Sequence, residues 1–319
     1  MSLVPAIRIQ DCNQAPLRPS ARYVLYWMIA NRRLAHNFAL DRSLEHCRSM
    51  GKPLLILEAL RCDYPWASDR LHRFVLDGMA DNALQCERHG ILYYPYVEPA
   101  PFAGSGLLES LAANAAAVVT DDFPCFFLPN MVATAAKKLP VRLESVDSNG
   151  LLPLRATNQV FSRAFDFRRY LQKVLSAHLA EIPLADPLAK SASPSRPSLP
   201  TAITSKWPPA AAPLLAGEPA ALPALLIDHR VSTTHFRGGH KNAQKRLRHF
   251  LEHFEDYAES RNEPEDDATS GLSAYLHFGH ISVHEVFAAL AAHERWQPEK
   301  LALRASGGRE GWWLSLIHI

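Results

Sequence analysis

The sequence predicts an α/β domain built on a parallel sheet, followed by the beginning of an all-helical domain. Apolar runs alternate with amphipathic helical patterns between Arg22 and Asp147. Ten of the 24 prolines then fall between Pro183 and Pro223. From about Leu225 the pattern is helical again. Alternating strands and helices imply parallel strands joined by right-handed crossovers, so we expect the sheet in the first half of the chain and helices in the second.

Five strands and four helices are expected in the first half. The strands are expected at residues 23–29, 53–60, 91–97, 117–121 and 141–146, and the helices at 36–50, 69–88, 106–114 and 124–139. The second helix shows the reasoning, because its apolar residues recur every three to five positions and form one face: Leu71, Phe74, Val75, Met79 and Leu84. No GxGxxG or Walker sequence follows any of these strands, so no dinucleotide or nucleoside-triphosphate site is predicted by motif.

The middle of the chain has the composition of a linker. A helical stretch is expected around residues 161–179, and the proline-rich segment after it contains much Ala and Ser and a single aromatic residue, Trp207. Such a composition favours extended or disordered chain, so we expect no regular helix there. The patterns predict an α/β domain at 20–150, a connection at 151–225 and a helical domain at 226–319. A fragment that ends near Leu179 is expected to fold by itself.

Composition and motifs exclude several classes of protein. The chain has 319 residues, of which 48% are hydrophobic, and no apolar run approaches the roughly 20 residues of a membrane span. Residues 1–5 do not resemble a secretory signal. The five cysteines have no CxxC or metal-like spacing and are expected to be reduced thiols in a cytoplasmic protein. No GxSxG elbow and no HExxH or similar spacing is recognised, so neither that type of hydrolase nor a metal site is expected.

Basic residues are unevenly distributed, although the net charge is only +2. Between His235 and Phe250 there are five of them and no acidic residue: Arg237, Lys241, Lys245, Arg246 and Arg248. Most basic runs on helices are solvated faces, but such a run can also contact nucleic-acid phosphates.

A turn rich in small hydroxylated residues precedes a predicted helix start, and it consists of Thr269, Ser270, Gly271, Leu272 and Ser273. Backbone N–H groups in a first helical turn lack partners within the helix, and a glycine among hydroxyl groups lets an anion approach them. An isolated turn of this kind is more often an ordinary helix cap. The turn alone does not distinguish a helix cap from an anion site, so the surrounding sequence is needed as well.

The surrounding sequence is similar to the flavin-binding region of the DNA photolyase/cryptochrome family. Residues 270–282 have the form SGLS-x-x-LHFG-x-IS, which most resembles class II cyclobutane-dimer photolyases. Ala274, Tyr275 and His280 depart from that class, in which proline, tryptophan and glutamine are usual. Further similar sequences follow in family order: RYVLYWM at 22–28, NRR at 31–33, HNFAL at 36–40, YYPY at 93–96, TDDFP at 120–124 and VDSNGLLP at 146–153.

The resemblance implies a deoxyribodipyrimidine photolyase with a Rossmann-like antenna domain and a helical FAD-binding domain. In such an enzyme, light-excited reduced FAD gives an electron to a cyclobutane pyrimidine dimer in UV-damaged DNA, and the electron returns after the dimer splits. The resemblance further implies that Tyr257 lies against the phosphate or ribitol region of the flavin cofactor and that residues 269–273 hold its pyrophosphate. It also implies that Arg261 contacts a phosphate of the damaged DNA strand. An antenna chromophore of the deazaflavin or folate type, no membrane partner and a monomeric state are also expected.

Other interpretations stay open at this point. Tyr257 is equally suited to packing on the core, and Arg261 to pairing with Glu259 or Glu263. A cryptochrome-like blue-light receptor would share the flavin site but signal instead of repairing DNA, and a flavin-free α/β nucleotide-binding module is a third alternative. The sequence after Trp313 has no counterpart in the family, so we expect a C-terminally truncated chain that is inactive by itself.

Overall fold

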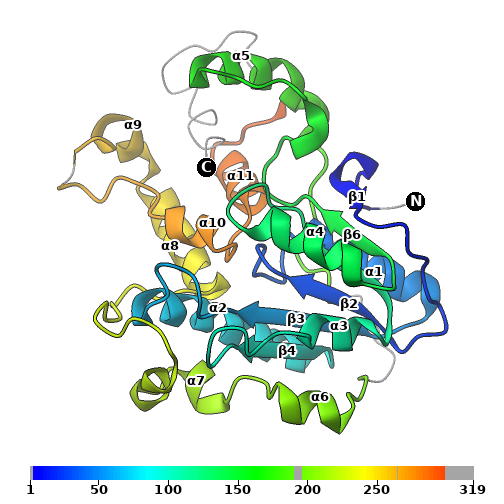
Figure 1. The fold of residues 1–319 in the computed structure, drawn as a ribbon. Coiled ribbons are helices and arrows are strands. Elements are labelled where there is room, and N and C mark those ends of the chain that lie inside the picture. Colours follow the sequence, from blue (N-terminus) through cyan, green and yellow to red (C-terminus); the bar gives the residue numbers. More distant parts are fainter. Residues whose placement is uncertain (1–2, 190–195, 264, 299–319) are drawn as a thin grey trace.

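A six-stranded sheet lies at the centre of the first half of the chain (Figure 1). The structure is a computed structural model that describes residues 3–189, 196–263 and 265–298. The strand order is β1-β6-β5-β2-β3-β4, and all neighbours except β1 and β6 are parallel. The strands are β1 (Ile9–Asp11), β2 (Tyr23–Met28), β3 (Leu54–Leu60), β4 (Leu92–Val97), β5 (Ala115–Asp121) and β6 (Leu143–Val146).

All the strands and helices predicted for the first half are present, with ends within a few residues of the prediction. The first helix begins after Asn37, whose side chain accepts hydrogen bonds from the Ala39 and Leu40 amides, and it ends at Gly51 in the left-handed conformation. The α-helices of the described residues are α1 (Phe38–Met50), α2 (Asp69–Arg88), α3 (Leu107–Ala112), α4 (Leu128–Lys138), α5 (Ala164–Val174), α6 (Thr201–Lys206), α7 (Ala212–Ala216), α8 (His240–Glu252), α9 (Tyr257–Ser260), α10 (Ser273–His277) and α11 (Val283–His293).

The five predicted strands are all parallel, but the sheet has a sixth strand at one edge that the sequence did not predict. β1 pairs with β6 in the antiparallel direction, with Ile9 opposite Val146. Ile9 is the single apolar residue of this three-residue strand, so no apolar run marks the strand in the sequence. A short strand in this position covers the hydrogen-bonding groups of β6 that would otherwise face solvent.

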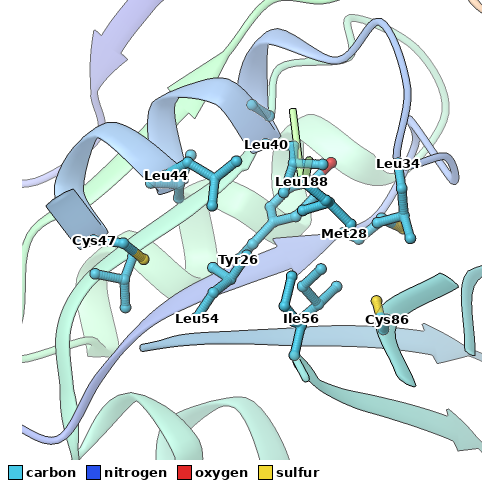
Figure 2. Packing of buried hydrophobic residues seen from close by; sticks show 14 of the residues in the cluster. Tyr26, Met28, Leu34, Leu40, Leu44, Cys47, Leu54, Ile56, Cys86 and Leu188 are labelled. Carbon is cyan, nitrogen blue, oxygen red and sulfur yellow. The ribbon is translucent and has the colours of Figure 1, made fainter. Parts of the chain in front are cut away.

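Two hydrophobic clusters cover the two faces of the sheet. Alternate residues of β2 point to opposite faces, as the pleat of a strand requires. Tyr26 and Met28 pack with α1 and α2 on one face, where Figure 2 shows them beside Leu40 and Ile56. Leu25 and its neighbours at alternate positions pack with α3, α4 and α6 on the other face. Because helices cover both faces, the first half has the three layers of a Rossmann-like domain.

The proline-rich segment is not the helix-free linker that its composition predicts. It contains α6, α7 and a 3₁₀ helix at Pro219–Ala224. Pro200 precedes the first residue of α6, and Pro213 lies in the first turn of α7, where a missing N–H breaks no helical hydrogen bond. Proline therefore starts these short helices instead of preventing them.

This segment packs along the β3–β4 side of the sheet (Figure 1). Ile203 and Trp207 are buried in the cluster that covers the α3 side, and Trp207 Nε1 donates to the Ala103 carbonyl oxygen at 3.0 Å. Leucines of α7 and the following 3₁₀ helix pack on α2. A fragment ending near Leu179 would expose these apolar surfaces, so we now propose that residues 199–227 belong to the folding unit of the sheet.

A third cluster holds the helical part together. It is formed by α5, α8, α10 and α11, with Leu171, Leu247, Leu272 and Leu290 at its centre. Phe74 of α2 also belongs to this cluster and stacks on His280 with ring centroids 4.9 Å apart. The predicted connection is thus divided, because α5 joins the helical part and the proline-rich segment joins the sheet.

Gly279 brings the helical part against the loop that follows β2. Its φ angle is +70°, and a Cβ atom there would clash with the carbonyl oxygen of Ala30. The buried Arg33 donates to the Gly279 carbonyl oxygen at 3.1 Å and reinforces the same contact. No helix in the described ranges combines the length and apolar character that membrane crossing requires.

Candidate functional site

One arginine of α8 holds the turn at residues 269–273 through its backbone carbonyl groups. Arg246 donates to the carbonyl oxygens of Thr269 and Ser270 at 2.7 and 2.8 Å. It also donates to both carboxylate oxygens of Asp267 at 2.6 and 2.8 Å, and these bonds lower the Asp267 pKa to about 2. Because C=O and N–H point in opposite directions across a trans peptide, the amides of Ser270 and Gly271 point away from Arg246.

Gly271 is required by this packing. Its φ angle is +61°, and a Cβ atom there would clash with the Arg246 guanidinium. A side chain at position 271 would therefore separate Arg246 from the turn. The sequence predicted that Gly271 allows an anion to approach the backbone. The structure shows a second role, because the missing side chain also lets Arg246 approach.

The structure divides the five predicted residues of the turn into two groups. Thr269 and Ser273 are exposed, and their hydroxyl groups are available to a ligand. Ser270 is buried, and its Oγ accepts from the Leu272 amide at 3.4 Å, while the Leu272 side chain is fully buried in the helical cluster. Among the described residues, the first-turn amides of α10 at positions 273–275 meet no acceptor. Backbone amides and two outward hydroxyls, rather than all five side chains, make this surface suitable for an anion.

Tyr257 and Arg261 lie together, as their spacing predicts. The Arg261 guanidinium stands over the Tyr257 ring, 5.5 Å from the centroid. The ring also packs edge-on against Phe250, with the ring centroids 5.5 Å apart. Tyr257 therefore makes the core contact that was considered as an alternative to flavin binding. Arg261 is exposed and forms no ion pair with any carboxylate that the structure describes. Tyr257 packs against the same helical cluster that contains Leu272.

Comparisons with known proteins extend over both halves of the chain. No family model matches it. It is 29% identical over 300 residues to a deoxyribodipyrimidine photo-lyase of Methanothermobacter thermautotrophicus, a match that covers 92% of this chain and 61% of the relative. A deoxyribodipyrimidine photo-lyase of Potorous tridactylus is 24% identical over 305 residues, which are 92% of this chain and 52% of the relative. The crystal structure of a bacterial class III photolyase from Agrobacterium tumefaciens superposes with a TM-score of 0.66 and 16% identity, covering 96% of this chain and 58% of that chain.

The chain is therefore similar to deoxyribodipyrimidine photolyases, members of the DNA photolyase/cryptochrome family, over 92% of its length. The family resemblance seen in the sequence is thereby confirmed, whereas assignment to class II stays a prediction. The chain spans 61% and 52% of the length of these two curated relatives. The expected C-terminal interruption concerns sequence after Trp313, outside the described residues.

Two residues that depart from the class II pattern, Tyr275 and His280, form specific hydrogen bonds to the backbone. His280 is fully buried, and its Nδ1 accepts a hydrogen bond from the Gly239 amide at 2.9 Å. Burial lowers the His280 pKa to about 3, so the ring is neutral and Nδ1 keeps its lone pair. Tyr275 donates to the Arg237 carbonyl oxygen at 2.8 Å, and both residues thus anchor the chain segment that starts α8.

The basic run on α8 is not one continuous cationic surface. Arg237 pairs with Asp77 at 2.7 Å and Lys241 with Asp81 at 3.4 Å, so these two residues fasten α8 to α2. Arg246 holds the turn at residues 269–273. Lys245 and Arg248 are exposed and pair with no described carboxylate. They are the members of the run that remain available to a phosphate.

The structure also assembles a group of side chains that the sequence interpretation missed. His249, Glu252 and His253 lie at the end of α8 with donor atoms within 4.8 Å of one another. The statement that no metal-like spacing occurs is therefore wrong, because two histidines four residues apart with a glutamate between them share one side of a helix. That spacing, H-x-x-E-H, was the signal available in the sequence.

Proposed function

We propose that the chain is part of a deoxyribodipyrimidine photolyase, which uses light and reduced FAD to split cyclobutane pyrimidine dimers in DNA. The observation that carries the proposal is the turn at residues 269–273, with amides directed outward and Arg246 behind it. Two relatives named deoxyribodipyrimidine photo-lyase, each matching over 92% of the chain, support the same assignment. We further propose a monomeric cytoplasmic protein, in agreement with five free cysteines.

The turn fits the diphosphate of FAD. Outward amides at positions 271 and 273 and the hydroxyls of Thr269 and Ser273 would donate to phosphate oxygens. Arg246 holds the turn without occupying its outer surface, and its positive charge offsets the negative charge of Asp267 close to the proposed diphosphate site. When bound, FAD supplies the light-driven electron transfer, and the residues of this chain bind and orient it. Tyr257 would border the same bound molecule, because its ring packs on the helical cluster beside the turn.

Exposed cations around the turn would hold the DNA. Arg261 keeps its guanidinium over Tyr257 and free of described carboxylates, which leaves its N–H groups available to a phosphate. Lys245 and Arg248 extend the positive charge along α8. Such contacts position a duplex but do not read its sequence, as expected for an enzyme that recognises a lesion in any context.

An antenna chromophore of the deazaflavin or folate type is proposed for the α/β half. Exposed aromatic side chains lie after the carboxyl end of β5, the end of a parallel sheet where ligands bind in open α/β folds. Phe126 is 66% exposed, stacks on Phe123 at 6.3 Å and contacts His277 of α10 edge-on at 5.7 Å. An aromatic pigment placed there would lie between the sheet and the helix that follows the flavin turn.

Binding of damaged DNA by the flavin-loaded chain tests this function. A labelled duplex with one cyclobutane dimer is expected to bind more tightly than the same duplex without it, and Arg261→Glu should weaken both complexes at low salt. Ser205→Glu places one new carboxylate at an exposed position of α6, away from the turn, and serves as the control. Equal affinity for the two duplexes would favour a photoreceptor, and a chain that retains no flavin after loading would favour the flavin-free alternative.

A further inference from the structure

Three side chains with metal-binding atoms converge at the carboxyl end of α8. His249 and His253 are four residues apart, and their ring centroids are separated by 4.6 Å. Glu252 lies on the same side, three residues after His249, and one donor atom from each of the three residues falls within 4.8 Å of the others. Glu252 and His253 are exposed, so small rotations about side-chain bonds can bring the donors to the shorter separations of a coordination shell.

The hydrogen bonds of His253 leave one ring nitrogen ready for coordination. Its Nδ1 lies 2.9 Å from the carbonyl oxygen of His249. A carbonyl oxygen only accepts, so Nδ1 of the neutral ring carries the proton and Nε2 carries the lone pair. Metal-bound histidines commonly donate their other N–H to a carbonyl or carboxylate, which fixes the ring orientation. The last turn of a helix, where carbonyl groups lack partners, also favours a cation.

A fourth acidic group comes from another segment. The carboxylate of Asp267 lies 3.4 Å from His249 Nε2, at the same edge of the group. Arg246 holds that carboxylate and also binds the carbonyl oxygens of the turn that follows. An ion at the end of α8 would thus be connected to residues 269–273 through Asp267 and Arg246.

The donor set identifies the class of ion. Two imidazoles and one carboxylate are ligands for borderline ions such as Zn²⁺, whereas Mg²⁺ and Ca²⁺ prefer oxygen ligands alone. We propose that His249, Glu252 and His253 bind one divalent transition-metal ion of the zinc type, with Asp267 beside the site. The site does not depend on flavin or DNA binding, and the contact between His249 and Asp267 connects it to the segment that carries the turn.

Calorimetric titration with ZnCl₂ tests the site in the full chain, prepared without an affinity tag and treated with a chelator. The wild-type chain should bind one equivalent of Zn²⁺ that excess Mg²⁺ does not displace. His249→Ala and His253→Ala should each weaken this binding by about tenfold or more, because each removes one ligand. His235→Ala removes an exposed histidine outside the group and should leave the affinity unchanged.

Absorption of bound Co²⁺ gives a second measurement that needs no change of sequence. Co²⁺ at two imidazoles and a carboxylate should produce visible ligand-field bands that Zn²⁺ abolishes at one equivalent. The proposal is overturned if the wild-type chain shows no saturable one-equivalent binding. It is equally overturned if His249→Ala and His253→Ala bind Zn²⁺ as tightly as His235→Ala, since the ion would then lie elsewhere.

Discussion

Two carboxylates at opposite ends of the burial range show how the two halves of the molecule differ. Asp121, at the end of β5, is fully buried and accepts from the Tyr26 hydroxyl and from the backbone amides of Ile29, Ala30 and Asn31. Asp267, before the turn at residues 269–273, has a side chain 66% exposed and is held by Arg246. The first carboxylate determines the path of the chain after β2. The second holds a surface turn and stays within reach of solvent and ions.

The hydrogen bonds of Asp121 and the ion pair of Asp267 differ in whether water can replace them when they break. The groups that donate to Asp121 lie in or next to the core, where water has little access. Loss of the Asp121 carboxylate would therefore leave these donors without acceptors. Water and salt can reach the exposed carboxylate of Asp267 when its bonds to Arg246 break, so this pair contributes less to stability. The buried carboxylate thus contributes to the rigidity of the sheet half, whereas the turn at residues 269–273 is held by bonds that solvent can exchange.

The largest expected effect comes from removing the buried carboxylate. Asp121→Ala should lower the free energy of unfolding by about 3–5 kcal/mol, because it leaves several buried donors unpaired. Asp267→Ala should lower it by about 1 kcal/mol or less. Urea unfolding in the presence of a chelator measures both. Similar losses for the two variants would remove the contrast between the two halves.

A second prediction concerns the contact where the halves meet. Gly279→Ala should destabilise the protein by about 2–4 kcal/mol, because the new methyl group clashes with the Ala30 carbonyl and the φ angle is positive. Gly90→Ala is the matched control, since Gly90 also has a positive φ angle, +66°, but open space around it. Thermal unfolding should show a clearly smaller loss for the control. Equal losses would mean that backbone strain alone, and not the close approach, requires glycine at 279.

A smaller effect that depends on pH is expected from a third carboxylate, which is buried like Asp121 but accepts fewer hydrogen bonds. Asp41 of α1 is buried, accepts one hydrogen bond from the Leu184 amide at 3.1 Å, and has no partner for its other oxygen within the described residues. Burial raises its pKa to about 7 from the ordinary value of 3.8. The folded state therefore holds a proton that the unfolded state releases between about pH 4 and 7, and stability falls as the pH rises through that range.

Asp41→Asn should remove this dependence, because an amide does not titrate. Above pH 7 the variant should be more stable than the wild type by about 1–3 kcal/mol, and below pH 4 the two should be nearly equal. Chemical unfolding at a series of pH values gives the comparison. A wild-type stability that rises between pH 4 and 7 in parallel with the variant's would contradict the role of Asp41.

The sequence predicted the sheet well because its signals are local. Buried strands such as β2 and β5 are continuous apolar runs, and α2 has a clear helical period, so each element is visible within its own residues. β1 contains one apolar residue and depends on β6, which lies more than a hundred residues away in the chain. The helices of the proline-rich segment likewise depend on α2 and α3 to bury their apolar residues.

Only one contact of the candidate site could be predicted from local sequence. The stacking of Arg261 on Tyr257 follows from their spacing of four residues. Nothing local indicates that Arg246 holds the turn, because the two are about two dozen residues apart in the chain. The inward direction of the Ser270 hydroxyl also depends on how Leu272 enters the helical cluster. The group at His249 was visible as a spacing and was overlooked.

The dissociation constant of FAD, measured by flavin fluorescence in a titration of the chain, is the sharpest test of the proposed flavin turn. Thr269→Glu combined with Ser273→Glu places two carboxylates on its outer surface, where they would repel the diphosphate. We predict FAD binding at least about tenfold weaker than in the wild type and in the Ser205→Glu control. Equal FAD affinity in all three proteins would show that the phosphates bind elsewhere and that the turn is an ordinary helix cap.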